Sequence, residues 1–259
     1  MSTDKFINPD NNEQKPLQEE LPATDGRRRQ LFLRIVRLCA FGVMALLHLS
    51  VLLVMLGSFI PPFTSSFMMR QRFTNAMHGE NSDIHYQWVR WKKISRSVPL
   101  AVVAAEDQKF PQHFGFDLDA IAKARRQNQN RTRPRGASTI TQQVAKNLYL
   151  WPGRSYFRKG LEAYFTLLLE VLWSKKRILE VYVNIAEFGP NIYGVGAAAS
   201  EFWGKSPAQL TQREAALLAA FLPNPKRLHA DRPSPYVEER VQWIETNMSQ
   251  LGLDYLDDL

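Results

Sequence analysis

The chain contains little cysteine and no long strand pattern. Its 259 residues include one cysteine, Cys39, which lies in an apolar segment. The sequence therefore excludes a disulfide framework and a thiolate metal cluster. It also carries no RNP motif, zinc knuckle or helix-turn-helix signature, so nucleic acid is disfavoured as a partner.

Alternating apolar and polar residues are absent over any useful length, and no internal repeat occurs. From Ser95 onward, apolar residues recur at helical spacing, which predicts a domain of the mainly α class. Ser138, Ser206, and Thr211 followed by Glu214 are typical of helix starts. The predicted helices are Val98–Asp107, Asp117–Gln127, Ser138–Leu148, Tyr156–Trp173, Lys175–Ala186, Gly196–Trp203, Thr211–Leu222 and Pro235–Leu251.

Composition and charge narrow the class of partner. A chain of 259 residues with 45% hydrophobic content can bury one sizeable core. The formal net charge of +8 favours a negatively charged partner such as anionic lipid or a phosphorylated substrate. A domain without disulfides that lies outside the cytoplasm fits a bacterium better than a eukaryotic secretory route.

The N-terminal part of the chain predicts a single-pass membrane anchor. Residues 1–37 form a polar tail that ends in a cluster of arginines, and residues 38–60 are apolar except for His48 and two serines. That run is long enough to cross a bilayer and too long for a signal-peptide core. The positive-inside rule places the tail in the cytoplasm and the rest of the chain outside. A buried globular helix is the alternative.

Residues 61–94 predict a membrane-proximal jaw or linker. They carry an apolar stripe broken by Arg70 and Arg72. The stripe either lies in the membrane interface or packs on the main domain, which we place at residues 95–259. Its members are Phe63, Phe67, Met68, Met69, Phe73 and Met77.

A first candidate site lies where an apolar run meets two carboxylates. Pro99–Ala105 leads directly into Glu106 and Asp107. A helix that buries this run places Glu106 at its C-terminal end, where lost hydration and the helix dipole both raise the carboxyl pKa. A raised pKa suits a general base. The alternative is that the two carboxylates only cap or solvate a helix end.

A second candidate is the stretch Gly136–Leu148. Gln142 and Lys146 lie one helical turn apart on a polar face, with Asn147 beside them. A helix N-terminus that follows a small polar turn around Ser138 can hold an anion. The alternative is a solvated amphipathic helix.

A third candidate is a carboxylate among cations. Glu162 shares a helix face with Arg158 and Lys159, and Arg154 precedes them. The simplest interpretation is a weak ion pair at i,i+4 spacing. Together with Glu106 and Lys146, however, the cluster fits a reaction whose leaving group is a pyrophosphate, since cations stabilise departing charge. A glycosidase needs a proton donor and has no obvious use for these cations.

Four stretches carry specific motifs: EDQKFPQHFGFD, GASTITQQVAKN, RKGLE and KKRILEVYVNIAEFGPNIYGVGAAA. In this order, over about Ser95 to Pro225, they resemble the successive motifs of the family 51 peptidoglycan glycosyltransferases. We expect no further domain after Leu259, which would resemble the monofunctional members and not the bifunctional penicillin-binding proteins.

The resemblance implies a lysozyme-like helical glycosyltransferase domain that polymerises lipid II into glycan strands, with inversion and release of undecaprenyl pyrophosphate. It implies that Glu106 is the base and that Glu162 orients or stabilises charge. It implies substrate contacts from Ser138, Gln142, Lys146, Asn147, Arg154, Arg158 and Lys159. Glu180, Tyr182 and Asn184 match a motif that we interpret as structural, and His113 is interpreted as a packing residue.

The resemblance also implies the surroundings of the enzyme. The partners expected are lipid II, the growing glycan chain, membrane lipid and other cell-wall synthesis proteins, in the bacterial inner membrane with the catalytic domain periplasmic. No cofactor or metal is required, although a divalent cation could sit at the pyrophosphate. The competing hypotheses are a lytic transglycosylase, which breaks strands, and a membrane-anchored scaffold without activity.

Overall fold

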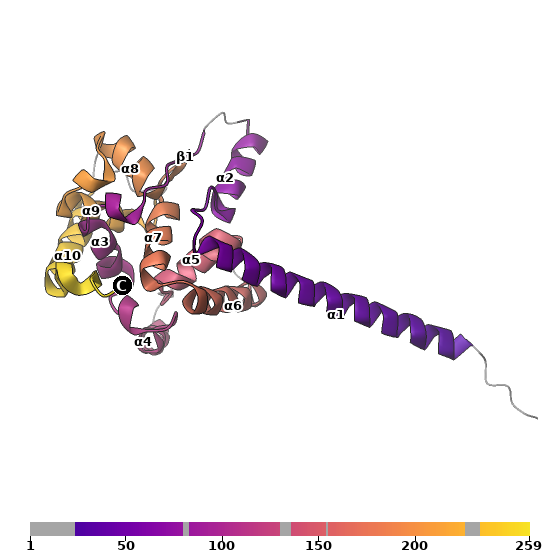
Figure 1. Ribbon diagram of the computed structural model, residues 1–259. Coiled ribbons are helices and arrows are strands. Elements are labelled where there is room, and N and C mark those ends of the chain that lie inside the picture. Colours follow the sequence, from indigo (N-terminus) through magenta and orange to yellow (C-terminus); the bar gives the residue numbers. More distant parts are fainter. Residues whose placement is uncertain (1–23, 80–82, 130–135, 154, 226–233) are drawn as a thin grey trace, which may run out of the picture. The chain divides into compact units, whose positions relative to one another are not determined.

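A computed structural model describes residues 24–79, 83–129, 136–153, 155–225 and 234–259. The chain divides into two compact units, Met1–Ser50 and Val51–Leu259. Because residues 1–23 and 154 are not among the described residues, most of the predicted tail and Arg154 lie outside them. The helix-rich architecture confirms the mainly α class (Figure 1).

Helix α1 spans Thr24–Gly57 and carries the predicted anchor. From Arg27 to Gly57 it is long and apolar enough to cross a membrane. Its apolar side chains between Leu31 and Ser50 are exposed almost throughout, which is what lipid contact requires and what a core helix of a soluble domain does not show. The described residues contain one helix of this kind.

Helix α3, Ser97–Glu106, is the centre of the second unit. Seven consecutive residues, Val98 to Ala104, are buried, so the helix is enclosed on every side. It packs on α9, Gln212–Phe221, on α10, Pro235–Leu251, and on α7, Lys175–Ile185. Enclosure on all sides fixes the end of α3, where Glu106 stands.

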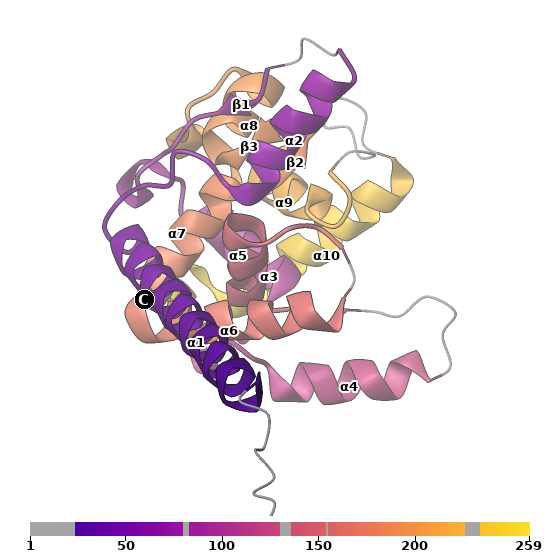
Figure 2. The same ribbon diagram turned by 90° about the vertical axis from the view of Figure 1, so that its right-hand side faces the viewer.

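Helix α5, Ile140–Tyr149, lies between α7 and α6, Tyr156–Leu172, as Figure 2 shows. Its N-cap is Thr139, whose hydroxyl accepts from the amide of Gln142 while the Gln142 side chain accepts from the Thr139 amide. The helix therefore begins two residues later than predicted, and Ser138 is not its cap. The predicted capping box of Thr211 and Glu214 is confirmed.

The remaining elements close the domain around these helices. Each boundary of the predicted helices falls within two residues of its observed place, because most helices start at a serine, threonine or aspartate cap. The other helices are α2, Ser66–Met77, α4, Leu118–Asn128, and α8, Gly194–Trp203, with short 3-10 turns at Trp91–Lys93, Phe110–Gln112, Pro207–Gln209 and Leu253–Leu256.

A small sheet was not predicted. Strand β3, Ile192–Tyr193, pairs in parallel with β1, His85–Tyr86, and antiparallel with β2, Glu187–Gly189. Strands of two or three residues leave no alternation for a sequence pattern to detect. Their order, β1-β3-β2, ties the segment after α2 to the segment before α8.

Helix α2 belongs to the predicted jaw segment and shows two faces. Met68 and Asn75 are buried, and α2 packs on α5. Met69, Phe73 and Met77 are each more than half exposed. One face of α2 thus packs on the domain, as one of the two alternatives states. The other face presents apolar side chains outward, and its contact with a membrane stays a prediction.

Candidate active site

Glu106 is the last residue of α3 and its side chain is 17% exposed. Gln143 Nε2 on α5 donates to Glu106 Oε2 at 2.9 Å. The guanidinium of Arg240 on α10 lies 3.5 Å from Glu106 Oε1. Two helices that are distant in sequence therefore hold one oxygen each of this carboxylate.

The environment of Glu106 raises its carboxyl pKa above the usual value. Burial is the largest cause, and the neighbouring Asp107 adds to it. The Gln143 hydrogen bond, Arg240 and Lys146 lower the pKa and offset part of the rise. The direction is the one expected from the sequence, and it suits a carboxylate that takes up a proton near neutral pH.

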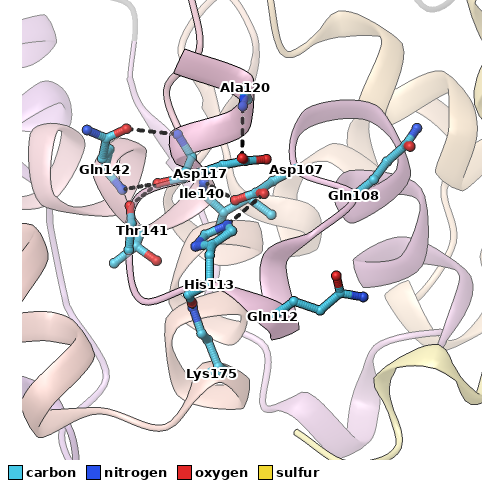
Figure 3. Close-up of polar contacts among 12 residues, drawn as sticks. Asp107, Gln108, Gln112, His113, Asp117, Ala120, Ile140, Thr141, Gln142 and Lys175 are labelled. Atoms are coloured by element: carbon cyan, nitrogen blue, oxygen red, sulfur yellow. Dashed lines mark hydrogen bonds and ion pairs between the residues drawn. The ribbon is translucent and has the colours of Figure 1, made fainter. Parts of the chain in front are cut away.

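Asp107, next to the candidate base, links the end of α3 to two other segments of the chain. Figure 3 shows it between His113 and the start of α5: Oδ1 lies 2.9 Å from His113 Nε2, and Oδ2 accepts from the Ile140 amide at 3.0 Å. The His113 side chain is 10% exposed, so it packs inside the domain for the most part, and it is also paired with the Asp107 carboxylate. The pair fixes the end of α3 against the N-terminus of α5.

Gly115 allows the loop after α3 to pass close to α6. Its φ is +76°, and an added Cβ would stand 2.7 Å from Thr166 Cγ2. Its carbonyl accepts from the Thr139 hydroxyl at 2.7 Å, which adds a second link to the start of α5. A side chain at this position would strain both the backbone and the packing.

A cavity of about 640 Å³ opens at Glu106. It runs between the C-terminal end of α3, the side of α10 and the side of α4, and its wall mixes charged and polar side chains with small apolar ones. Ser138 and Ala137 form part of its rim. This volume suits a sugar-sized polar ligand placed next to a carboxylate base.

A second cavity, of about 400 Å³, shares Ser138 with the first. Its wall carries three cations and one carboxylate: Lys146, Arg158, Lys159 and Glu162. Phe67 of α2 also lines it, and Lys146 Nζ lies 5.6 Å from the centre of that ring. The two cavities are therefore neighbours that meet at the turn before α5.

Lys146 is electrostatically linked to both glutamates. Burial lowers its pKa, while Glu162 and Glu106 each oppose that shift and Arg158 and Lys159 reinforce it. Burial and the two neighbouring cations disfavour the positive charge of Lys146, so a negatively charged ligand beside it would stabilise the ammonium. Lys146 is therefore a good receptor for an anion.

Glu162 is buried, with 2% of its surface exposed. Its Oε2 accepts from Arg158 Nη1 at 2.6 Å, and its Oε1 pairs with Lys159 Nζ. Arg158 Nε also donates to the Gly153 carbonyl at 2.9 Å. The i,i+4 ion pair of the simplest interpretation is therefore present, with Arg158 and Glu162 both buried. Lys159 is about half exposed, and Glu162 holds both cations in the cavity wall.

The other predicted contact residues differ in placement. Ser138 is exposed and lines both cavities. Gln142 lines the second cavity, although its amide oxygen is engaged in the capping box. Asn147 lines neither cavity, and its carbonyl accepts from Ser66. Arg154 falls outside the described residues.

Sequence reasoning missed Arg240 and left Gln143 out of the site. Arg240 lies beyond the stretch that resembles the family motifs, and nothing in its local pattern points to Glu106. For Gln143 a signal existed, since it stands one helical turn before Asn147 and next to Gln142. Within the described ranges, no group of three or more His, Cys, Asp and Glu side chains is placed to hold a metal ion.

Comparison with known proteins identifies the family. The family model described as Transglycosylase matches residues 72–249. The chain therefore belongs to the transglycosylase family, a class of glycosyl-transferring enzymes with a lysozyme-like helical fold. The match reaches α10 and so includes Arg240.

Three similar proteins share the name biosynthetic peptidoglycan transglycosylase. The chain is 53% identical over 204 residues to the biosynthetic peptidoglycan transglycosylase of Xanthomonas campestris pv. campestris strain B100, covering 78% of this chain and 83% of that protein. It is 48% identical over 232 residues to the protein of the same name from Pseudomonas fluorescens, covering 89% and 95%. The corresponding protein of Pasteurella multocida is 52% identical over 207 residues, covering 80% and 84%.

Proposed function

We propose that this chain is a peptidoglycan glycosyltransferase that polymerises lipid II into β-1,4-linked glycan strands. The observation that carries the proposal is the pair of cavities joined at Ser138, one with Glu106 in its wall and the other with three cations. Glycosyl transfer from a lipid pyrophosphate needs these two functions side by side: a base for the attacking hydroxyl and positive charge for the leaving group.

In the proposed mechanism, the acceptor sugar occupies the Glu106 cavity. Glu106 takes the proton of the acceptor 4-hydroxyl, and that oxygen forms a bond to the anomeric carbon of the donor. The bond from that carbon to the phosphate oxygen breaks, and undecaprenyl pyrophosphate leaves with the electron pair. Attack from the face opposite the leaving group inverts the anomeric configuration. The raised pKa of Glu106 makes it a better proton acceptor than an exposed carboxylate.

The second cavity is proposed to receive the pyrophosphate. Lys146, Arg158 and Lys159 would meet the charge that grows on the phosphate oxygens as the bond breaks. Glu162 would act through them, since it holds Arg158 and Lys159 by direct ion pairs. A divalent cation at the pyrophosphate is a separate prediction. Polymerisation that persists in a chelator would exclude a requirement for it.

The proposed membrane setting is supported by the length and apolar composition of α1. We propose that this helix anchors the chain once in the bacterial inner membrane, with residues 1–37 cytoplasmic and the catalytic domain periplasmic. The arginines that precede the apolar run support this orientation. The exposed apolar face of α2 would then lie near the lipid, where the substrate's own lipid chain resides.

The deciding experiment mixes purified protein in detergent with lipid II and separates the products by size. Glycan polymer together with released undecaprenyl pyrophosphate is the expected result. A lytic transglycosylase would instead shorten preformed glycan, and a scaffold would do neither. Failure to elongate lipid II under conditions in which a known polymerase does so would overturn the proposal.

A further inference from the structure

Tyr182 lies inside the domain yet is linked to the candidate base. It stands on α7 with 1% of its surface exposed. Its hydroxyl donates to Gln143 Oε1 at 3.0 Å, and Gln143 Nε2 donates to Glu106 Oε2 at 2.9 Å. Its motif neighbours behave differently, because Glu180 and Asn184 bind the backbone amides of Trp91 and Val89.

The donors and acceptors in this chain of hydrogen bonds are fixed by the ionisation state of Glu106. An ionised carboxylate can only accept, so it requires the NH₂ side of the Gln143 amide. A protonated carboxyl could donate to the amide oxygen and would favour the flipped amide. In the part of the chain that the structure describes, the acceptor recorded for the Tyr182 hydroxyl is Gln143 Oε1. Flipping the amide would therefore leave a buried hydroxyl without its acceptor, which is costly.

We propose that Tyr182 is a positioning residue for glycosyl transfer, which through Gln143 keeps the Glu106 carboxylate ionised and aimed at the first cavity. The inference rests on the proposed role of Glu106 as the base. It assigns to Tyr182 a function in place of the purely structural one that its motif indicated.

The properties of Tyr182 fit a permanent donor. Burial, reinforced by the negative charges of Glu106 and Asp107, holds the pKa of its hydroxyl well above the usual value. The hydroxyl therefore keeps its proton throughout the range in which the enzyme would be assayed. A donor of this kind biases the amide in one direction at every such pH.

Other charged groups also face Glu106 and stay in place when the hydroxyl is removed. They are Lys146 on α5, Arg240 on α10 and the adjoining Asp107, with His113 behind Asp107. Because Phe fills the same apolar space as Tyr, Tyr182→Phe changes the hydrogen bond and little else. A change in the titration of Glu106 in this variant is then due to loss of the hydrogen bonds from Tyr182 through Gln143 to Glu106.

The experiment is a pH–rate profile of lipid II polymerisation for Tyr182→Phe. Without the hydroxyl the amide can flip, so the carboxyl pKa rises and the acid limb moves to higher pH. We expect the limb to move by about half to one pH unit, which lowers turnover below the limb about three- to tenfold and leaves it near normal well above the limb. KM for lipid II should change little, since the hydroxyl does not reach the cavity. Tyr193→Phe is the matched control, because Tyr193 is also buried and lines neither cavity, while the hydroxyl bonded to Gln143 is that of Tyr182.

Gln143→Ala removes the middle of the same link, that is, both of its hydrogen bonds. It should move the acid limb in the same direction, and the double variant should move it little further than the single variant with the larger effect. A wild-type limb in Tyr182→Phe, or a loss equal at every pH, overturns the inference. If Tyr182→Phe does not fold, an unmoved limb in Gln143→Ala overturns it as well. An inactive wild-type protein would overturn the proposed function instead, so the two failures are distinguishable.

Discussion

Arg240 lies 3.5 Å from Glu106, although 134 positions separate them in the chain. The contact brings α10 to the end of α3 and places a cation beside the candidate base. Its effect opposes that of burial, since a nearby positive charge favours the ionised carboxylate. The pKa of Glu106 is therefore set by two opposing causes, burial and the charge of Arg240, and a substitution can change one without the other.

Removing the cation should raise the pKa of Glu106 further. Because the base works only when ionised, Arg240→Gln should move the acid limb of the pH–rate profile upward and restore turnover as the pH increases. When the limb moves up by about one pH unit, turnover measured below it should fall about tenfold. The control is Arg213→Gln, since Arg213 pairs with Glu238 and Glu245 of the same α10 but lines neither cavity. An unchanged limb in Arg240→Gln would separate Arg240 from the base.

The two glutamates should respond differently to the same conservative change. Glu106→Gln removes the base while keeping its size, so turnover should fall by about 10²–10⁴-fold. Glu162→Gln should cost less turnover, because Glu162 acts through Arg158 and Lys159. It should cost more stability, since breaking a buried ion pair destabilises by about 3–5 kcal/mol. Turnover and thermal unfolding of both variants test this. Near-normal polymerisation by Glu106→Gln would end its assignment as the base.

The acid limb of the wild-type profile has a predicted position. Since burial raises the pKa of Glu106, the limb should lie above the value of about 4.3 that is usual for a glutamate. Activity is therefore expected to be present above the limb and lost as the pH falls through it. A limb at or below the usual value would contradict the desolvated site.

Lys146 should matter most during bond breaking. If its ammonium meets the pyrophosphate, the contact strengthens as charge builds on the leaving group, so Lys146→Ala should lower kcat by about 10²–10³-fold. Lys146→Arg need not restore activity, because a planar guanidinium does not replace a compact ammonium. Lys176→Ala is the control: Lys176 lies over the Trp91 ring at 5.7 Å and lines neither cavity. A normal kcat with weaker membrane association would indicate lipid attraction alone.

Gly115 offers a test of the loop that supports the site. Gly115→Ala should lower the free energy of unfolding by about 1–2 kcal/mol from the left-handed backbone and by about 1–3 kcal/mol from crowding against Thr166. Gly160→Ala is the opposite case, since Gly160 is exposed on α6 with open space around it. Replacing it should stabilise by about 0.5–1 kcal/mol. Equal melting temperatures for the two variants would contradict the close approach of this loop to α6.

Much of the fold could be predicted because its helices carry local signals. The starts of α6 and α10 were placed correctly at Tyr156 and Pro235, each directly after a serine cap. At α5 two adjacent residues could serve as the cap, and Gln142, three positions after Thr139, was the signal that decided between them. The strands were missed because pairs such as His85↔Ile192 join short segments that are far apart in sequence.

The site was predictable only in part, for a related reason. Glu106, Lys146, Arg158 and Glu162 stand in local patterns of charge and apolar residues that suggest chemistry. Arg240 and Tyr182 acquire a role only through tertiary contacts, with Glu106 and Gln143 respectively. Asn147 shows the converse, since it was chosen by helical spacing but lines neither cavity.

The burial of α3 determines how its backbone amides exchange their hydrogens with solvent. Because every side of the helix from Val98 to Ala104 is covered, no local opening can expose its amides to solvent without separating α7, α9 and α10 from it. Its amide hydrogens should therefore exchange with deuterium only when the whole domain unfolds. Glu106 follows this protected segment by two residues, at the end of the same helix, so the backbone that carries the candidate base is anchored in the most slowly exchanging part of the domain.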